Sequence, residues 1–590
     1  MTMNRREFMA ILAAASAAGM LPGCSKRSAV SQSTQAAYDL PAFGNARLLH
    51  FTDCHAQLLP IYFREPNVNL GLGTAYGRPP HLVGHKLLDY LQIKPDTRAA
   101  HAFSYLNYVD AAEQYGKVGG FAHLKTLVDQ LRGAVSHSLL LDGGDTWQGS
   151  ATAYWTRGKD MVGACNLLGV DIMTGHWEFT YLDEEVLANI EAFNGEFLAQ
   201  NVKVTEDALF DDAPAYDEDS GHAFKPYTIK QMGEHRVAVI GQAFPYTPIA
   251  NPSRFIPDWT FGIQEQALQE LVNQIKASEK PQAIVLLSHN GMDVDIKLAS
   301  QVSGIDVILG GHTHDGIPVP VVVKNNGGQT HVTNAGSNGK FLAVLDLQLT
   351  ATGVSDVRYK LLPVFSNFLR ADANMLAHIE NMRQPYLDKL NEPLAVAGSL
   401  LYRRGNFNGS FDQVICDALR EQLDAQVALS PGFRWGTSVL PGQTITMEHV
   451  MDQTAITYPE TYARNMKGSE LKLILEDVAD NLFHEDPYRQ QGGDMVRVGG
   501  LQYTCDPLAG AGARVQDLRL DDGELIEANK DYKVAGWATV GSRAPGPDIW
   551  DVVADHLREQ KSVSVDKLNT PKLLGVSDNP GIADYQGEFS

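Results

Sequence analysis

The sequence predicts a two-domain α/β protein. Its 590 residues are too many for one compact core, so we expect two domains with a junction past the middle of the chain. Short apolar runs typical of buried strands alternate with helix-like stretches such as 121–131 and 263–276, as in α/β domains. With 44% hydrophobic and 20% charged residues, the composition is that of a folded globular protein.

Charge and cysteine usage exclude several classes of protein. The formal net charge of −22, from 48 basic and 70 acidic residues, argues against binding nucleic acid over a broad face. The five cysteines are widely separated and form no C-x-x-C pair, so neither a structural zinc site nor a disulfide framework is indicated. No run of residues approaches the roughly 20 apolar residues of a membrane span.

The N-terminal region is typical of a targeting signal. Arg5 and Arg6 precede an apolar run over 10–21 that is too short to span a bilayer. This order resembles a twin-arginine export signal, so we expect residues 1–36 to be a signal with a flexible segment and the protein to be periplasmic. Leu21-Pro22-Gly23-Cys24 leaves a lipid anchor on Cys24 open as an alternative.

Polar residues follow the apolar runs that we expect to be strands. Because the carboxyl ends of parallel strands meet at one edge of a sheet, these residues should lie close together. They are all imidazoles or carboxylates, and they follow the runs 47–51, 139–141, 170–173, 283–287 and 307–309: Asp53, His55, Asp145, His176, His289, His312 and His314.

These seven residues suffice for two metal ions that share one bridging carboxylate. A single histidine after a strand is more often structural, but the D-x-H and H-x-H spacings favour a metal site. Gly-Gly before Asp145 and before His312 would let the backbone fold tightly around an ion. Nitrogen and oxygen donors without thiolate indicate manganese, zinc or iron. Cys54 lies between two proposed ligands and should point the other way, into the core.

The motifs resemble the binuclear metallophosphoesterase domain of the 5′-nucleotidase family. They are Asp53-Cys54-His55, Gly143-Gly144-Asp145, Ser288-His289-Asn290-Gly291 and Gly311-His312-Thr313-His314, in that order. The resemblance implies a four-layer N-terminal metallophosphoesterase domain and a smaller α/β C-terminal domain of the 5′-nucleotidase type. It also implies that Asp145 bridges the ions, that Asp53, His55 and His314 complete one, and that His289 and His312 serve the other.

One motif departs from the family pattern. Where 5′-nucleotidases carry Gly-Asn-His-Glu followed by an Asp, this chain has Gly175-His176-Trp177-Glu178-Phe179-Thr180. His176 replaces an asparagine ligand and can still bind metal. Trp177 replaces the catalytic histidine and Thr180 its aspartate partner, and an indole cannot protonate a leaving alkoxide.

A thiol or persulfide leaving group needs no such acid. The His176-Trp177 pair, with the segments 52–57 and 62–66, is similar to the SoxB thiosulfohydrolases of bacterial sulfur oxidation. This similarity implies a hydrolase with two Mn²⁺ ions, with zinc or iron as substitutes. Its substrate would be a cysteine S-thiosulfonate on the SoxYZ carrier protein, and metal-bound hydroxide would attack the sulfonate sulfur and release sulfate.

The second half supplies a substrate-binding surface in this interpretation. We expect a catalytic domain over 37–370, a linker helix over 371–389 and a second domain over 390–590. Arg434 falls where the family has Asn-Gly-Gly-hydrophobic-Arg and would clamp the sulfonate, unless it forms a surface or interdomain ion pair. We therefore expect Arg434, His176 and Asp145 to carry the catalysis.

Two other functions stay open. The first is a periplasmic phosphoesterase of the 5′-nucleotidase type, against which Trp177 and Thr180 argue. The second is a catalytically silent, metal-bound binding protein, which the same two substitutions would also produce. A mere binding protein has no evident need for seven ligands and two ions.

Overall fold

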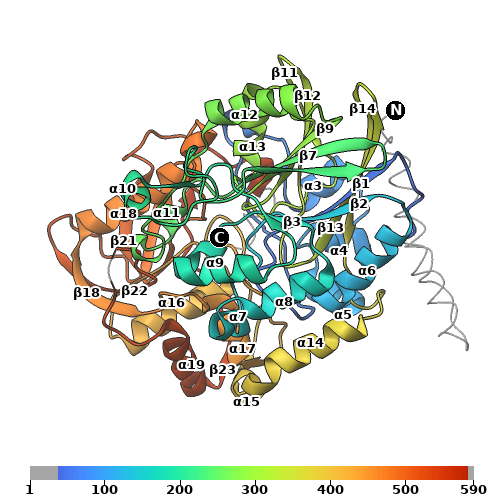
Figure 1. Cartoon of the computed structure of the whole chain (residues 1–590). Helices are drawn as coiled ribbons and strands as arrows, with labels where there is room; N and C mark the ends of the chain where they lie inside the picture. The colour runs from blue at the N-terminus through green and yellow to red at the C-terminus, as the bar shows by residue number, and fades with distance from the viewer. Residues whose placement is uncertain (1–37, 542, 583–590) are drawn as a thin grey trace, which may run out of the picture.

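Two six-stranded sheets make up the first part of the chain in the computed structural model, which describes residues 38–541 and 543–582 (Figure 1). In each sheet four neighbouring strands run parallel to one another. The first sheet has the order β14 (Gly353–Pro363), β13 (Phe341–Thr350), β1 (Ala46–Phe51), β2 (Ser138–Asp142), β3 (Ile172–Met173) and β4 (Glu196–Phe197). The second has the order β11 (Val321–Asn325), β12 (Gly328–Asn334), β10 (Val307–Gly310), β9 (Ala283–Ser288), β7 (His235–Gln242) and β6 (Tyr227–Met232).

The two sheets pack face to face between layers of helices. Successive side chains of a strand point to opposite faces. Leu48 of β1 packs with Val285 of β9 in the core between the sheets, whereas Leu49 packs with Phe121 on the outer face. On the far side, Ile284 joins a third core beneath helices. This arrangement of helix, sheet, sheet and helix confirms the predicted four-layer α/β domain.

Along the chain, the helices of this part lie between its strands. The two stretches predicted as helical, 121–131 and 263–276, correspond to α6 (Phe121–Gly133) and α12 (Glu265–Ser278) with slightly shifted ends. The helices are α3 (Gly84–Leu91), α4 (Arg98–Phe103), α5 (Tyr108–Tyr115), α6 (Phe121–Gly133), α7 (Ala151–Thr156), α8 (Lys159–Leu168), α9 (Asp183–Ala192), α10 (Glu206–Phe210), α11 (Thr247–Ala250), α12 (Glu265–Ser278) and α13 (Met292–Gln301). The pair β5 (Lys203–Val204) and β8 (Trp259–Thr260) lies outside both sheets.

The later part of the chain, orange to red in Figure 1, is a second mixed α/β unit, and one buried apolar cluster consists mostly of its residues, with Val68 and Leu70 added from the first part. Its main sheet has the order β18 (Thr461–Lys467), β22 (Asp531–Trp537), β16 (Val427–Ser430) and β19 (Arg497–Gly499). Two three-stranded sheets join β17 (Thr444–Thr446), β15 (Pro393–Ala397) and β23 (Ser562–Val563), and β21 (Val515–Leu520), β20 (Leu501–Cys505) and β24 (Lys572–Leu573). The helices are α16 (Ser410–Gln422), α17 (Met447–Thr454), α18 (Gly468–Phe483) and α19 (Ile549–Gln560).

The connection expected as one helix over 371–389 is divided. The first helix, α14 (Ala373–Arg383), begins after Asp372, whose side chain accepts the N–H of Met375 at 2.8 Å as an N-cap. A 3-10 turn with Pro385 near its start follows, and then the short α15 (Leu387–Leu390). Proline lacks an N–H and clashes with the preceding turn, so the helix cannot continue through it.

The predictions for the N-terminal region fall on residues that the structure does not describe. The twin-arginine signal with Arg5 and Arg6, and the lipid anchor at Cys24, lie outside the described residues. Among the residues described, none of the helices is both long and apolar enough to cross a bilayer.

Candidate metal centre

The predicted ligands lie at the carboxyl ends of five strands from both sheets. Each strand ends within a few residues of its ligands, with Asp53 and His55 after β1 and Asp145 after β2. The parallel direction of these strands brings their following loops to one edge of the sandwich, as expected for α/β folds. His176 follows β3 in the same sheet, and His289, His312 and His314 follow β9 and β10 in the other.

The structure brings all seven predicted residues together as two clusters that share Asp145. Within each cluster the potential ligand atoms lie within 4.8 Å of one another, and every residue is buried. One cluster contains Asp53, His55, Asp145 and His314, and the other contains Asp145, His176, His289 and His312. This grouping is consistent with a binuclear metal centre bridged by one carboxylate.

Distances between donor atoms fit ions held at each cluster. In the first cluster His314 Nε2 lies 3.2 Å from Asp53 Oδ1 and 3.0 Å from His55 Nε2. In the second, Asp145 Oδ2 lies 3.0 Å from His289 Nε2 and 3.2 Å from His176 Nδ1. Donors that are each about 2.0–2.2 Å from one ion are separated by about 3 to 3.5 Å in octahedral or tetrahedral geometry. The observed spacings match this requirement.

Several imidazole nitrogens of these clusters are buried without a hydrogen-bond partner. In the described part of the chain this holds for both nitrogens of His312, Nδ1 of His55 and His314, and Nε2 of His176. Buried polar atoms are normally paired, and a bound cation would account for one nitrogen of His312, whereas the unpaired atoms of His55, His314 and His176 are the ring nitrogens opposite those that face the clusters. The His289 Nδ1–H donates to the Gly143 carbonyl at 2.6 Å, which orients the ring so that Nε2 lies 3.0 Å from Asp145 Oδ2.

The charge states also suit metal binding. Burial lowers the pKa of His55 to about 3, and burial holds the pKa of His312 and His314 well below the ordinary value. These rings are therefore neutral and can donate a lone pair. Burial opposes protonation of His289, but Asp145 and Asp53 outweigh it and raise its pKa to about 10. A cation at the clusters would replace this proton.

Five of the seven residues have left-handed backbone conformations. The φ angles are positive at Asp53, His55, Asp145, His312 and His314, between 45° and 71°. Non-glycine residues rarely adopt this region, and such strain is concentrated at functional sites. The glycine pairs permit close approach, as predicted. A Cβ on Gly311 would lie 2.5 Å from Thr52 Oγ1 and 3.0 Å from Asp53 Oδ2.

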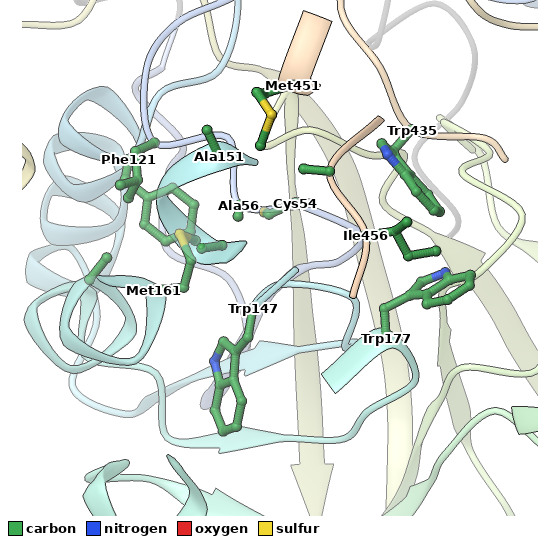
Figure 2. Close-up of a cluster of buried hydrophobic side chains, with 14 of the residues drawn as sticks. Cys54, Ala56, Phe121, Trp147, Ala151, Met161, Trp177, Trp435, Met451 and Ile456 are labelled. Atoms are coloured by element: carbon green, nitrogen blue, oxygen red, sulfur yellow. The ribbon is translucent and has the colours of Figure 1, made fainter. Parts of the chain in front are cut away.

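The residues that replace the nucleotidase dyad contact the second part of the chain. The Trp177 ring lies edge-on to Phe433 and Trp435, with centroid distances of 5.5 and 5.2 Å. Trp435 in turn stacks on His55, with a distance of 5.4 Å between the ring centroids. Figure 2 shows both tryptophans on one side of a group of buried hydrophobic side chains. Thr180 Oγ1 lies 2.7 Å from Thr457 Oγ1. Trp177 therefore forms an aromatic wall with Phe433 and Trp435, and Thr180 forms a hydroxyl pair with Thr457.

Each side-chain nitrogen of Arg434 makes one hydrogen bond to a protein acceptor, which leaves two of its five N–H groups for other partners. Its Nε lies 3.2 Å from Asp494 Oδ1, Nη2 donates to the Gly493 carbonyl at 3.0 Å, and Nη1 donates to the His312 carbonyl at 3.4 Å. The ion pair with Asp494 is the alternative that the sequence left open, although it lies within the second part. The bond to His312 nevertheless puts the guanidinium at the edge of the second cluster.

Sequence reasoning gave no role to Arg404. Its side chain is buried, Nη2 donates to the Thr313 carbonyl at 3.3 Å, and Nε has no partner within the described residues. It lines a pocket together with Glu65, His314 and Asp315. The doubled arginine before Gly405 was the one signal in the sequence.

Comparison with solved structures identifies the family. The chain superposes on the sulfate thiohydrolase SoxB of Thermus thermophilus, solved in complex with glycerol, with a TM-score of 0.85. The two are 37% identical, and the match covers 91% of this chain and 98% of that one. The chain belongs to the SoxB family. As a SoxB-family protein within the 5′-nucleotidase superfamily, it is a metal-dependent hydrolase.

More distant relatives agree with this assignment. Residues 399–555 match the family model for the 5′-nucleotidase C-terminal domain. Bovine 5′-nucleotidase is 27% identical over 462 residues, which is 71% of this chain and 76% of the relative. A 5′-nucleotidase precursor from Thermus thermophilus shares the fold, with 22% identity, a TM-score of 0.70 and coverage of 90% and 99% of the two chains.

Proposed function

We propose that this chain is a dimanganese hydrolase that releases sulfate from a cysteine S-thiosulfonate on the SoxYZ carrier protein. The observation that carries the proposal is that Trp177 lies beside the two clusters of metal ligands, at the position where phosphoester chemistry requires a proton donor. In the reaction, water attacks the sulfonate sulfur and the S–S bond breaks. Its electron pair stays on the carrier as a persulfide anion, and sulfate and two protons are released.

The donor set supports two ions in defined roles. Asp53, His55 and His314 would hold one ion, while His176, His289 and His312 would hold the other. Asp145 would bridge both. When bound, the ions supply a nucleophile from water at neutral pH and stabilise oxyanion charge.

Manganese is the metal that the SoxB resemblance implies, and the described donor set is compatible with it because neither cluster contains a cysteine. Cys54 is fully buried in the apolar core, at the centre of Figure 2, as the sequence predicted. Burial, together with Asp142 and Asp53, raises the pKa of its thiol well above the ordinary value. The nitrogen and carboxylate donors that face the clusters suit Mn²⁺, with zinc and iron as substitutes.

The aromatic wall supports a leaving group that departs unprotonated. Trp177 is nearly buried, and its neighbours Phe433 and Trp435 offer no titratable proton. A persulfide is far more acidic than an alcohol, so it leaves as an anion without this help. Arg434 lies between these two aromatic residues in the sequence, and its guanidinium reaches the His312 carbonyl. We propose that it balances the charge of the sulfonate oxygens.

A 5′-nucleotidase activity is the second candidate, because several curated relatives that match over most of the chain are 5′-nucleotidases. The deciding experiment measures sulfate release from a carrier cysteine S-thiosulfonate beside phosphate release from AMP, with manganese-loaded protein. We expect sulfate alone, and neither product from the Asp145→Ala variant. Phosphate without sulfate would return the chain to the nucleotidases, and neither product from the wild type would indicate a silent binding protein.

The cellular setting is also proposed. Arg5 and Arg6 with the following apolar run support export to the periplasm by the twin-arginine route. The division into a catalytic domain over 37–370, a linker over 371–389 and a substrate domain over 390–590 is supported by the sheets of the described residues, none of which joins strands from both sides of the linker. Mass spectrometry of the exported protein would locate the cleavage site and show whether Cys24 carries lipid.

A further inference from the structure

Glu178 is a buried carboxylate between the two loops that carry Asp145 and His176. Its Oε2 accepts the N–H groups of Asp145 at 3.1 Å and His176 at 2.8 Å. Its Oε1 accepts those of Thr146 at 2.7 Å and Trp147 at 3.1 Å. The hydrogen bonds found for this carboxylate in the described part of the chain all come from the backbone. One side chain therefore fastens the loop after β2 to the loop after β3.

The two loops are bound reciprocally. The Trp177 N–H donates to Asp145 Oδ1 at 2.7 Å, while the Asp145 N–H donates to Glu178. Asp145 has a φ of 58°, in the left-handed region that non-glycine residues rarely adopt. Bonds at both its amide and its carboxylate hold it there. Because Asp145 belongs to both clusters, any movement of this residue would disturb both.

We propose that Glu178 is a positioning residue for the binuclear centre, which sets Asp145 and His176 in the relative positions that two ions require. The inference rests on the proposed metal-holding role of these two residues and not on the identity of the substrate. Residues that orient metal ligands typically change metal affinity by about 10- to 100-fold when substituted. Loss of Glu178 should weaken both ions together, since the shared ligand moves.

The test compares Glu178→Gln with a matched variant elsewhere. A glutamine has one acceptor oxygen, so its NH₂ group must face two N–H donors in either orientation. Glu476 is the control, because it is also buried and its two oxygens accept backbone N–H groups, from Arg514 at 3.0 Å and Val515 at 2.8 Å. Glu476→Gln perturbs the second part of the chain in the same chemical way.

The measurement is a calorimetric titration of the metal-free full chain with Mn²⁺, followed by the electron paramagnetic resonance signal of the coupled ion pair. We expect Glu178→Gln to bind both ions about 10- to 100-fold more weakly and to lose the coupled signal, while Glu476→Gln matches the wild type. If Glu178→Gln fails to fold, the test uses Glu178→Asp, which keeps the charge on a shorter arm. This variant should bind Mn²⁺ more weakly than Glu476→Gln does.

Two outcomes would overturn the proposal. One is a wild-type titration and coupled signal in Glu178→Gln, and the other is an equal loss in Glu476→Gln. Mn²⁺ binding is measured without substrate. A chain that hydrolysed AMP instead of a thiosulfonate would still show the effect, so failure of the proposed function is distinguishable from failure of this inference.

Discussion

Replacing Gly311 with alanine should selectively damage the metal centre. The added Cβ would lie 2.5 Å from Thr52 Oγ1, 2.9 Å from His289 Nδ1 and 3.0 Å from Asp53 Oδ2. To regain ordinary contact these atoms must retreat by about 0.4–0.9 Å, an overpacking that typically costs about 1–3 kcal/mol. If that cost falls on the ligands, Mn²⁺ affinity drops by about 5- to 150-fold, since about 1.4 kcal/mol is tenfold.

The assay is calorimetric titration of the metal-free protein with Mn²⁺. Gly510→Ala is the matched control, because nothing lies within 4 Å of a Cβ at that position and its φ is not positive. We expect wild-type affinity from the control. Wild-type affinity from Gly311→Ala would refute the reasoning, because it would mean that the loops around Asp53 and His289 can move without loss of the site.

Three further outcomes follow from the contacts. Burial, and then the neighbouring Glu448 carboxylate, raises the pKa of Asp452 to about 8, so its protonated form stabilises the fold below about pH 4 and this contribution is lost as the pH rises through 8. The stability of Asp452→Asn relative to the wild type, measured by thermal unfolding, should therefore increase between pH 4 and 8. A stability difference that stays constant over this range would contradict the prediction. Asp346→Ala should lower the free energy of unfolding by about 3–5 kcal/mol in denaturant titrations, because it leaves Arg47 buried without the partner that lies 2.7 Å away. A loss below about 1 kcal/mol would show that Arg47 finds another partner or water. Mn²⁺ at about 100 times its dissociation constant should stabilise the chain by about 2.7 kcal/mol per site, reversed by a chelator, and an unchanged midpoint would exclude tight binding to the folded state.

The strand ends explain why the ligand set could be predicted from sequence. Asp53, Asp145 and His289 each follow a short apolar run, and parallel strands bring such positions to one edge whatever the intervening helices do. The Gly-Gly steps before Asp145 and His312 indicated tight turns, and the structure shows close contacts at Gly311. Local pattern and topology agreed at these positions, so the prediction needed no tertiary detail.

Long-range contacts explain what the sequence could not show. Arg434 pairs with Asp494, 60 positions later, and Trp435 stacks on His55 from the other part of the chain. No local pattern encodes such partners. Glu178 stood in the analysed motif, but its role depends on four amides from two loops. The division of the helix at Pro385, by contrast, was readable, because a proline inside a helical stretch commonly ends it.

The leaving-group dependence of hydrolysis tests the central claim most directly, namely that the leaving sulfur departs without a proton from position 177. The measurement is kcat/KM for sulfate release from a series of organic thiosulfates whose leaving thiols differ in acidity, from aromatic thiols to alkyl thiols near the cysteine value of about 8.5. Without a general acid, the account predicts a steep fall in rate as the pKa of the leaving thiol rises. A flat dependence, with chemistry still limiting, would contradict it and reveal a proton donor at the site.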